Sequence, residues 1–270
     1  MRKPQLIATD VDGTLLGPKE RLTTRTRNAV TSAVQGEVPV VLVSGRPPRW
    51  LAPVAELAGL TGYAVCSNGA VLYDIGADEV LELHGLDPEF LHTVAATLDR
   101  ALPDCRIGAE RVGTHALDHE VRRFVSEPGY HNPWGDPEEH VAERADVLAH
   151  TAVKLLVSDP RMTSDAMAHA ARAALDGSVD VTFSTGGGLI EIAKHGITKA
   201  TGLAEVAGRF GVPAEGTIAF GDMPNDVLML RWAGHGVAMA NAHPSVREAA
   251  DEITAPNSED GVAQVLERWF

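Results

Sequence analysis

The most constraining feature of this sequence is an alternation, near its start, of short apolar segments with segments of helical character. Leu6–Thr9 is an apolar run, and Val38–Val43 is apolar and largely β-branched. Strands of a parallel sheet are covered on both faces and therefore read as continuous apolar runs. Helices expected at about 23–34 and 50–57 separate these runs from a third strand at Ala64–Cys66. This βαβαβ spacing predicts an α/β fold with a mostly parallel, Rossmann-like sheet.

The final third repeats the pattern, whereas the middle of the chain differs. Strands are expected at 217–220 and 236–239, with helices between and after them. Residues 84–185 carry more Pro and Gly breaks, with helices and strands in separate runs, as in an α+β insert. We therefore expect a discontinuous core of residues 1–83 and 186–270 and an inserted domain of residues 84–185. The glycines at 186–188 are expected to form a hinge at the return to the core.

Composition excludes several classes of partner. The chain has 270 residues with a formal net charge of −14, and an acidic field repels nucleic acid and anionic membranes. The longest strongly apolar run has six residues, from Val38 to Val43, whereas a membrane-spanning helix needs about 20. We expect a cytoplasmic protein that binds neither nucleic acid nor membranes.

Two acidic residues follow the first strand directly. Asp10 and Asp12 are separated by one residue and precede Gly13, which permits a tight turn. Ligand sites of parallel sheets lie beyond the carboxyl ends of the strands. Two carboxylates placed there can share one reacting centre, one as nucleophile and the other as general acid and base. The alternative is a solvated acidic turn, and an isolated Asp-x-Asp favours that reading.

Three further segments place charged or polar groups where strands end or helices begin. Ser44-Gly45-Arg46 follows the second strand and offers a hydroxyl, an unhindered amide and a guanidinium to an anion. Lys199 begins a helix, where a cation gains nothing from the helix dipole unless it faces an anion or a carboxylate. Asp222 follows a later strand and suits Mg²⁺, which favours few carboxylates and several waters. Each of the three has an ordinary alternative: a turn, a surface lysine or a helix cap.

Together these segments resemble the haloacid dehalogenase-like (HAD) superfamily of hydrolases, specifically its Cof-type branch, subfamily IIB. The family's four motifs correspond, in order, to Asp10-Val11-Asp12-Gly13-Thr14, Ser44-Gly45-Arg46, Lys199 and Gly221-Asp222-Met223-Pro224-Asn225-Asp226. Further similarity lies at Cys66–Ala70, Leu189–Ile192, Val237–Ala242 and Glu259–Val262. The resemblance covers about residues 5–82 and 186–270, and the insert resembles the family's C2-type cap domain.

The resemblance implies a role for each motif residue. Asp10 would be the nucleophile that forms an aspartyl-phosphate, Asp12 the general acid and base, and Lys199 a further catalytic cation held by Asp226 or Asp222. Mg²⁺ would bind Asp10, the Asp12 backbone carbonyl and Asp222. The substrate-binding residues would be Ser44, Gly45, Arg46, Asn68 and Asn225, and Thr14 and Asp226 would support the metal ligands. For Arg46 and Asn68 a structural role is an equal alternative. Glu191, at the return from the insert to the core, reads more readily as a surface glutamate on a strand than as a substrate contact.

The implied function is a Mg²⁺-dependent phosphomonoester hydrolase acting on small phosphorylated metabolites, with sugar phosphates the favoured class. Two alternatives stay open on the sequence. A phosphotransferase or phosphomutase could use the same core if the aspartyl-phosphate were protected from water. A non-catalytic ligand-binding homologue is disfavoured because Asp10, Asp12, Lys199 and Asp222 are all present.

Overall fold

The computed structural model describes residues 2–133 and 135–270, which divide into two compact units. The first unit comprises Met1–Leu81 and Thr198–Phe270, and the second comprises Glu82–Ile197. Among the described residues, no helix is long and apolar enough to span a bilayer.

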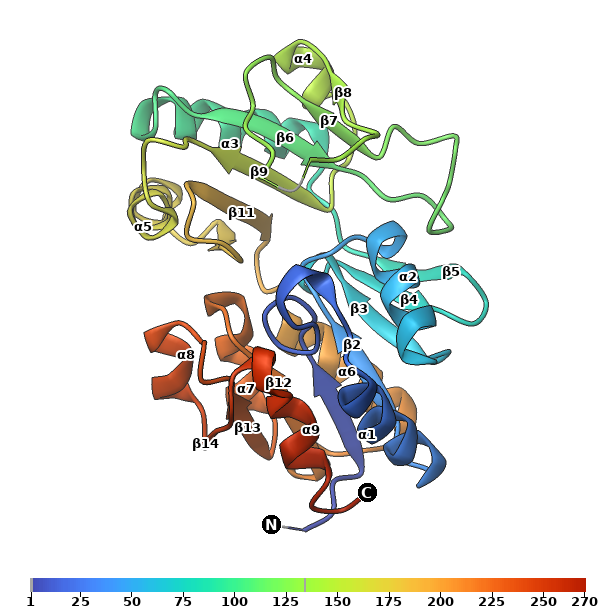
Figure 1. Cartoon of the computed structure of the whole chain (residues 1–270). Coiled ribbons are helices and arrows are strands. Elements are labelled where there is room, and N and C mark those ends of the chain that lie inside the picture. The colour runs from blue at the N-terminus through green and yellow to red at the C-terminus, as the bar shows by residue number, and fades with distance from the viewer. Residues whose placement is uncertain (1, 134) are drawn as a thin grey trace. The chain divides into compact units, whose positions relative to one another are not determined.

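The first unit is built on an eight-stranded sheet in the order β14-β13-β12-β1-β2-β3-β4-β5 (Figure 1). The pairs from β14 to β3 are parallel, and β4 runs antiparallel to β3. The strands are β1 (Leu6–Thr9), β2 (Val40–Val43), β3 (Tyr63–Cys66), β4 (Val71–Asp74), β5 (Glu79–Leu83), β12 (Thr217–Gly221), β13 (His235–Ala238) and β14 (Glu252–Ile253). The expected α/β fold with a mostly parallel sheet is confirmed, although the β4–β5 segment was not anticipated as strands.

Two groups of helices accompany this sheet. The helices are α1 (Thr24–Gln35), α2 (Pro48–Ala58), α6 (Lys199–Phe210), α7 (Val227–Trp232), α8 (Pro244–Ala249) and α9 (Gly261–Leu266). In one group α1 packs against α2 and α9, and in the other α7 packs against α6 and α8. Every residue of β1 and β2 is buried, which explains their continuous apolar sequences.

The second unit contains a six-stranded sheet in the order β10-β11-β9-β6-β7-β8, antiparallel except for β7 and β8 (Figure 1). Its strands are β6 (Arg106–Glu110), β7 (Phe124–Ser126), β8 (His140–Val141), β9 (Lys154–Ser158), β10 (Val179–Thr182) and β11 (Leu189–Lys194). Its helices are α3 (Pro88–Ala101), α4 (Arg144–Val147) and α5 (Ser164–Leu175). Helices α3 and α5 pack against each other, and α5 also packs on β10 and β11.

The return from the second unit lies later in the chain than the sequence suggested. Strand β11 pairs antiparallel with β9 and β10, so its residues belong to the second unit, and the chain re-enters the first unit at Thr198. The glycines at 186–188 lie in the connection between β10 and β11 rather than at the return. The sheet to which β11 belongs is decided by the strands that pair with it, and its own amino-acid composition does not reveal those partners.

Glu191 also differs from its sequence interpretation as a surface residue. It is 1% exposed on β11, and its carboxylate accepts hydrogen bonds from Lys154 Nζ at 2.7 Å and Ser184 Oγ at 2.5 Å. A buried carboxylate needs a partner of this kind to remain charged.

Candidate active site

Asp10 lies immediately after β1, between the ends of β2 and β12. Its backbone N–H donates to the carbonyl of Phe220 at 2.9 Å, which fixes the end of β1 against β12. The side chain is buried, and burial raises its pKa well above the usual value. The positive charge of Lys199 opposes this effect, whereas the nearby aspartates reinforce it.

Lys199 is the cation of the site and the first residue of α6. Thr198 caps this helix by accepting a hydrogen bond from the N–H of Thr201. Lys199 Nζ lies 2.6 Å from Asp10 Oδ1 and 2.6 Å from Asp226 Oδ1. Burial alone would lower the pKa of Lys199, but the two carboxylates outweigh it and raise the pKa above its usual value. Of the two residues proposed to hold Lys199, the structure places Asp226 in contact with it.

The loop after β12 brings two aspartates to the same place. Asp226 Oδ2 accepts the backbone N–H groups of Asp222 and Met223, each at 2.9 Å, and so shapes the 3₁₀ turn η4 (Pro224–Asp226). Thr14 donates its hydroxyl to Asp222 Oδ1 at 3.0 Å. Gly13, with φ of +78°, permits this approach because a Cβ there would lie 2.2 Å from Asp222 Oδ2.

The carboxylates outnumber the cations at this point of the sheet. Oxygens of Asp10, Asp222 and Asp226 lie within 4.8 Å of one another, and all three residues are buried. Burial, followed by the charge of Asp226, raises the pKa of Asp222 to about 7. Three carboxylates around one lysine leave an excess of negative charge that a divalent cation with oxygen ligands would neutralise. The residues present therefore fit a Mg²⁺ ion.

Asp12 has a different environment from Asp10. Its side chain is 53% exposed, and its carboxylate forms a two-point ion pair with Arg46, at 2.8 Å to Nε and 2.5 Å to Nη2. Glu20 also lies 3.3 Å from the same guanidinium. Among the described residues, the side chain of Asp12 is not one of the three grouped carboxylates. The Asp12 carboxylate is thus accessible to solvent, in contrast to that of Asp10.

The remaining predicted substrate-binding residues occupy neighbouring loops. Ser44 is buried after β2, and its hydroxyl accepts the backbone N–H of Arg46 at 3.1 Å, with Gly45 between them. Asn68 is buried in η2 (Ser67–Gly69), and its Oδ1 accepts a hydrogen bond from Asn225 Nδ2 at 3.0 Å. The structure therefore joins Asn225, a residue of the fourth motif, to Asn68, which lies in the similar segment Cys66–Ala70 outside the motifs.

Two asparagines that support the Asp10 loop were missed as site residues. Asn241 donates its side-chain amide to the carbonyl of Gly13 at 2.9 Å, and Asn257 donates to the carbonyl of Leu16 at 2.8 Å. Asn241 also accepts the backbone N–H of Asn257 at 2.9 Å. The similarity noted at Val237–Ala242 includes Asn241 and was the available signal, but it carried no indication of the contact.

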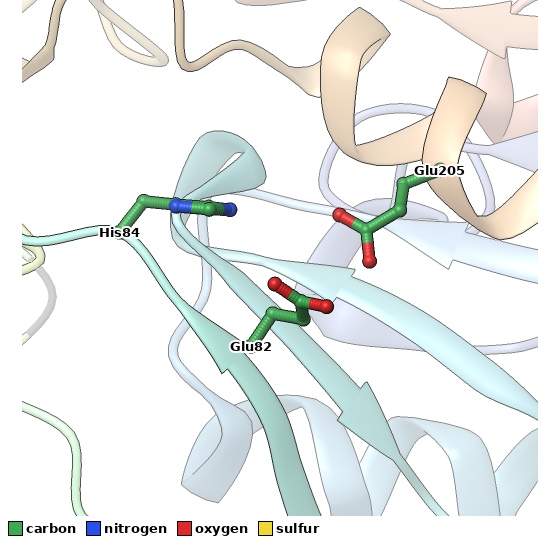
Figure 2. A group of neighbouring side chains, drawn as sticks. All are labelled: Glu82, His84 and Glu205. Carbon is green, nitrogen blue, oxygen red and sulfur yellow. The ribbon is translucent and has the colours of Figure 1, made fainter.

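A second group of potential metal ligands is drawn in Figure 2. Its members are Glu82 on β5, His84 in the segment that follows, and Glu205 on α6. The boundary between the two units falls within β5, so that Glu82 and His84 belong to the second unit and Glu205 to the first. We therefore assign no metal site to these three residues.

Comparison with known proteins shows one family over the whole chain. The sequence pattern of the haloacid dehalogenase-like hydrolases matches residues 7–266. The 5-amino-6-(5-phospho-D-ribitylamino)uracil phosphatase YitU of Bacillus subtilis (strain 168) is 30% identical, with 99% of this chain and 98% of YitU covered. The pyridoxal phosphate phosphatase YbhA of Escherichia coli (strain K12) is 27% identical, with 97% of each protein covered.

A solved structure supports the same fold. That of SMU.1108c from Streptococcus mutans UA159 matches with a TM-score of 0.84, covers 98% of each chain and is 22% identical. The agreement of full-length sequence relatives with a full-length structural neighbour extends the likeness to both units.

Proposed function

The chain belongs to the haloacid dehalogenase-like hydrolases and is a phosphatase of that family, and from this premise we propose its reaction and its catalytic residues. The substrate would be a phosphomonoester of a small soluble metabolite, with sugar phosphates the favoured class. The observation that carries the proposal is the buried arrangement of Asp10, Lys199, Asp222 and Asp226 beyond the ends of β1 and β12.

Asp10 would act as the nucleophile in the first step. Lys199 holds its carboxylate in place through Oδ1, which reduces the entropy lost on reaching the phosphorus atom. A bond forms between a carboxylate oxygen and phosphorus while the bond from phosphorus to the leaving oxygen breaks. Asp12 would donate a proton to that leaving oxygen.

The second step would hydrolyse the aspartyl-phosphate. Asp12, now ionised, takes a proton from the attacking water, and the bond between phosphorus and Asp10 breaks to release phosphate. Asp12 is ion-paired with Arg46 in the structure. We propose that a bound ester draws this guanidinium towards its own oxygens, and that the freed Asp12 carboxylate takes up a proton from water before it protonates the leaving oxygen in the first step.

Mg²⁺ is the proposed cofactor, held by Asp10, the backbone carbonyl of Asp12 and Asp222, with Thr14 orienting Asp222. When bound, the ion would offset the repulsion between the carboxylates and the anionic phosphoryl group. Ser44, the amide of Gly45, Lys199 and Asn225 are the proposed ligands of the phosphoryl oxygens. Asp226 accepts hydrogen bonds from Lys199 and from the backbone N–H of Asp222, and so holds both residues in place.

A phosphate-release assay tests the proposal. The wild-type protein is offered a panel of sugar, nucleotide and vitamin phosphates with Mg²⁺ or with chelator, and no phosphoryl acceptor is added. We expect Mg²⁺-dependent phosphate release that Asp10→Asn abolishes, whereas Asp176→Asn, the same change at an exposed position, leaves it intact. If the wild type consumed the ester only after an acceptor was added, with the phosphoryl group recovered on that acceptor and no free phosphate, the protein would be a phosphotransferase. Turnover by Asp10→Asn would exclude the covalent mechanism.

A further inference from the structure

The turn η2, between β3 and β4, has an unusual backbone. Ser67, Asn68 and Gly69 have consecutive positive φ angles of 50°, 59° and 102°. Side chains with a Cβ disfavour this region, and such conformations persist where surrounding contacts impose them. Asn is among the non-glycine residues that adopt it most readily. The question is therefore which contacts hold this turn.

The backbone of the turn is bonded to the loop that follows β2. The N–H of Ser67 donates to the carbonyl of Arg46 at 2.9 Å, and the N–H of Asn68 donates to the carbonyl of Ser44 at 3.0 Å. Two successive hydrogen bonds fix both ends of the Ser44–Arg46 segment. The proposed phosphoryl-binding loop thus takes its conformation from η2.

The same turn meets the two other proposed catalytic segments. A Cβ at position 69 would lie 2.1 Å from the carbonyl oxygen of Thr198, the residue before Lys199, so the backbone of Gly69 lies directly against the start of α6. The side chain of Asn68, 3% exposed, accepts the hydrogen bond from Asn225 Nδ2. The Ser44–Arg46 segment, the start of α6 and the loop of Asn225 therefore all contact the turn η2.

We propose that Asn68 is a positioning residue of the phosphatase site, which holds Ser44 and Asn225 in register with Lys199, and not a contact to the leaving group. This inference rests on the proposed function, and it revises the substrate-binding role that the sequence suggested for Asn68. Its buried amide is directed at Asn225, and its backbone at Ser44. Residues that orient metal ligands typically change affinity or activity about 10–100-fold, and we expect an effect of the same size here.

The main test replaces Asn68 with glycine, which adopts positive φ freely but lacks the amide. We expect kcat/KM to fall about 10–100-fold, chiefly through kcat, while the Tm stays within a few degrees of wild type. The loss should be the same for a sugar phosphate and an activated aryl phosphate. Glu37→Gly is the matched control, because Glu37 has φ of 60° at an exposed position of the same unit, and it should keep wild-type kinetics.

Three outcomes would overturn the proposal. A loss that differs between the two esters would make Asn68 a leaving-group contact. A parallel fall of Tm and activity would reduce it to a structural residue. Independent effects in the double variant Asn68→Gly/Asn225→Ala, with the two losses multiplying, would show that Asn68 does not act through Asn225.

A second measurement does not depend on turnover. Amide hydrogen exchange in the metal-free protein should be faster in Asn68→Gly than in wild type at residues 44–46, which bond to the loosened turn, and at residues 222–226, which lose the hydrogen bond of Asn225. It should be unchanged in Glu37→Gly. Unaltered exchange at both segments overturns the positioning role even if wild type hydrolyses no ester tested. Failure of the proposed function would instead appear as wild-type protein without phosphate release, so the two failures are distinguishable.

Discussion

Lys154 in the second unit and Lys199 in the first are both almost completely buried, and each lies within 2.7 Å of a carboxylate oxygen. Lys154 lies within the regular pairing of an antiparallel sheet, with its partner Glu191 on the adjacent strand. Lys199 lies outside strand pairing, at the start of a helix, among Asp10, Asp226 and Asp222.

The difference shows that a buried pair of lysine and carboxylate can stabilise a sheet in one place and form part of a ligand site in another. A side chain on a paired strand, such as Lys154 opposite Glu110, has its position fixed by the register of the sheet. One beyond the strand ends is placed by loops that also form ligand sites. Around Lys199, beyond the strand ends, the carboxylates have shifted pKa values: those of Asp10 and Asp222 are both raised. Such shifts concentrate where chemistry requires them.

The largest effect is expected on stability, from Lys154→Met. This change leaves the Glu191 carboxylate buried without its lysine, which typically costs about 3–5 kcal/mol. Replacing both residues, as Lys154→Met/Glu191→Leu, should recover most of that loss. Denaturant unfolding measures all three proteins. The contrast between a structural Lys154 and a catalytic Lys199 would be wrong if both variants, Lys154→Met and Lys199→Met, lowered the turnover of an activated aryl phosphate per folded molecule by the same factor.

Lys199→Met is expected to act mainly on turnover. Loss of a fixed positive group beside the reacting phosphoryl should lower kcat by about 10²–10³-fold. Steady-state kinetics at saturating Mg²⁺ measures this effect, and circular dichroism verifies that the variant is folded. If the variant kept a normal kcat, Lys199 would have only a structural role, as Lys154 does.

Asp222 gives a pH-dependent prediction for the metal-free protein. Its folded pKa of about 7 exceeds the ordinary value of 3.8, so the folded state binds a proton more tightly than the unfolded state. The associated stability is present below about pH 4 and is lost as pH rises through 7. Asp222→Asn should therefore stabilise the chelator-treated protein by about 2–4 kcal/mol at pH 8 and by less at pH 5.

Thermal unfolding at the two pH values measures this difference. Excess Mg²⁺ should raise the Tm of wild type and have little effect on Asp222→Asn, because binding to the folded state alone stabilises it. An equal gain at pH 5 and pH 8 would mean that the charge of Asp222 is not the cause.

The smallest expected effect concerns Asp12, whose ion pair with Arg46 is exposed where those of both lysines are buried. Asp12→Ala should slow hydrolysis of alkyl phosphates about 10-fold more than that of activated aryl phosphates, because the latter need no proton on departure. Comparison of kcat/KM for the two esters measures the ratio. A ratio near one would remove Asp12 as general acid.

The sequence predicted the parts of the site that adjoin strong local patterns. Asp10, Lys199 and Asp222 were found because each directly follows a buried strand or begins a helix. The choice between Asp222 and Asp226 as partner of Lys199 stayed open, since it depends on how η4 turns its side chains. The contact between Asn68 and Asn225 was not foreseen, because residues 157 positions apart reveal no pairing in a single sequence.

The fold was predictable to a similar extent. Continuous apolar runs identified the parallel strands, which are buried on both faces. Strand β11 was recognised as similar to a family segment but attributed to the wrong unit, because its membership depends on β9 and β10. Glu191 was misjudged for the same reason, since its burial depends on Lys154 from another strand.

The order in which the strands of the first sheet are joined has a consequence for synthesis of the protein. Leu6 in β1 pairs with Thr217 in β12, so one edge of β1 has no neighbour until the ribosome has added about 200 further residues and made β12. Pairing over such a separation is slow, and an apolar strand that waits for it is exposed to aggregation. A nascent chain that ends before Asp222 also lacks two of the grouped carboxylates. Activity should therefore appear only after Asp226 has been synthesised, which is later than the whole of the second unit.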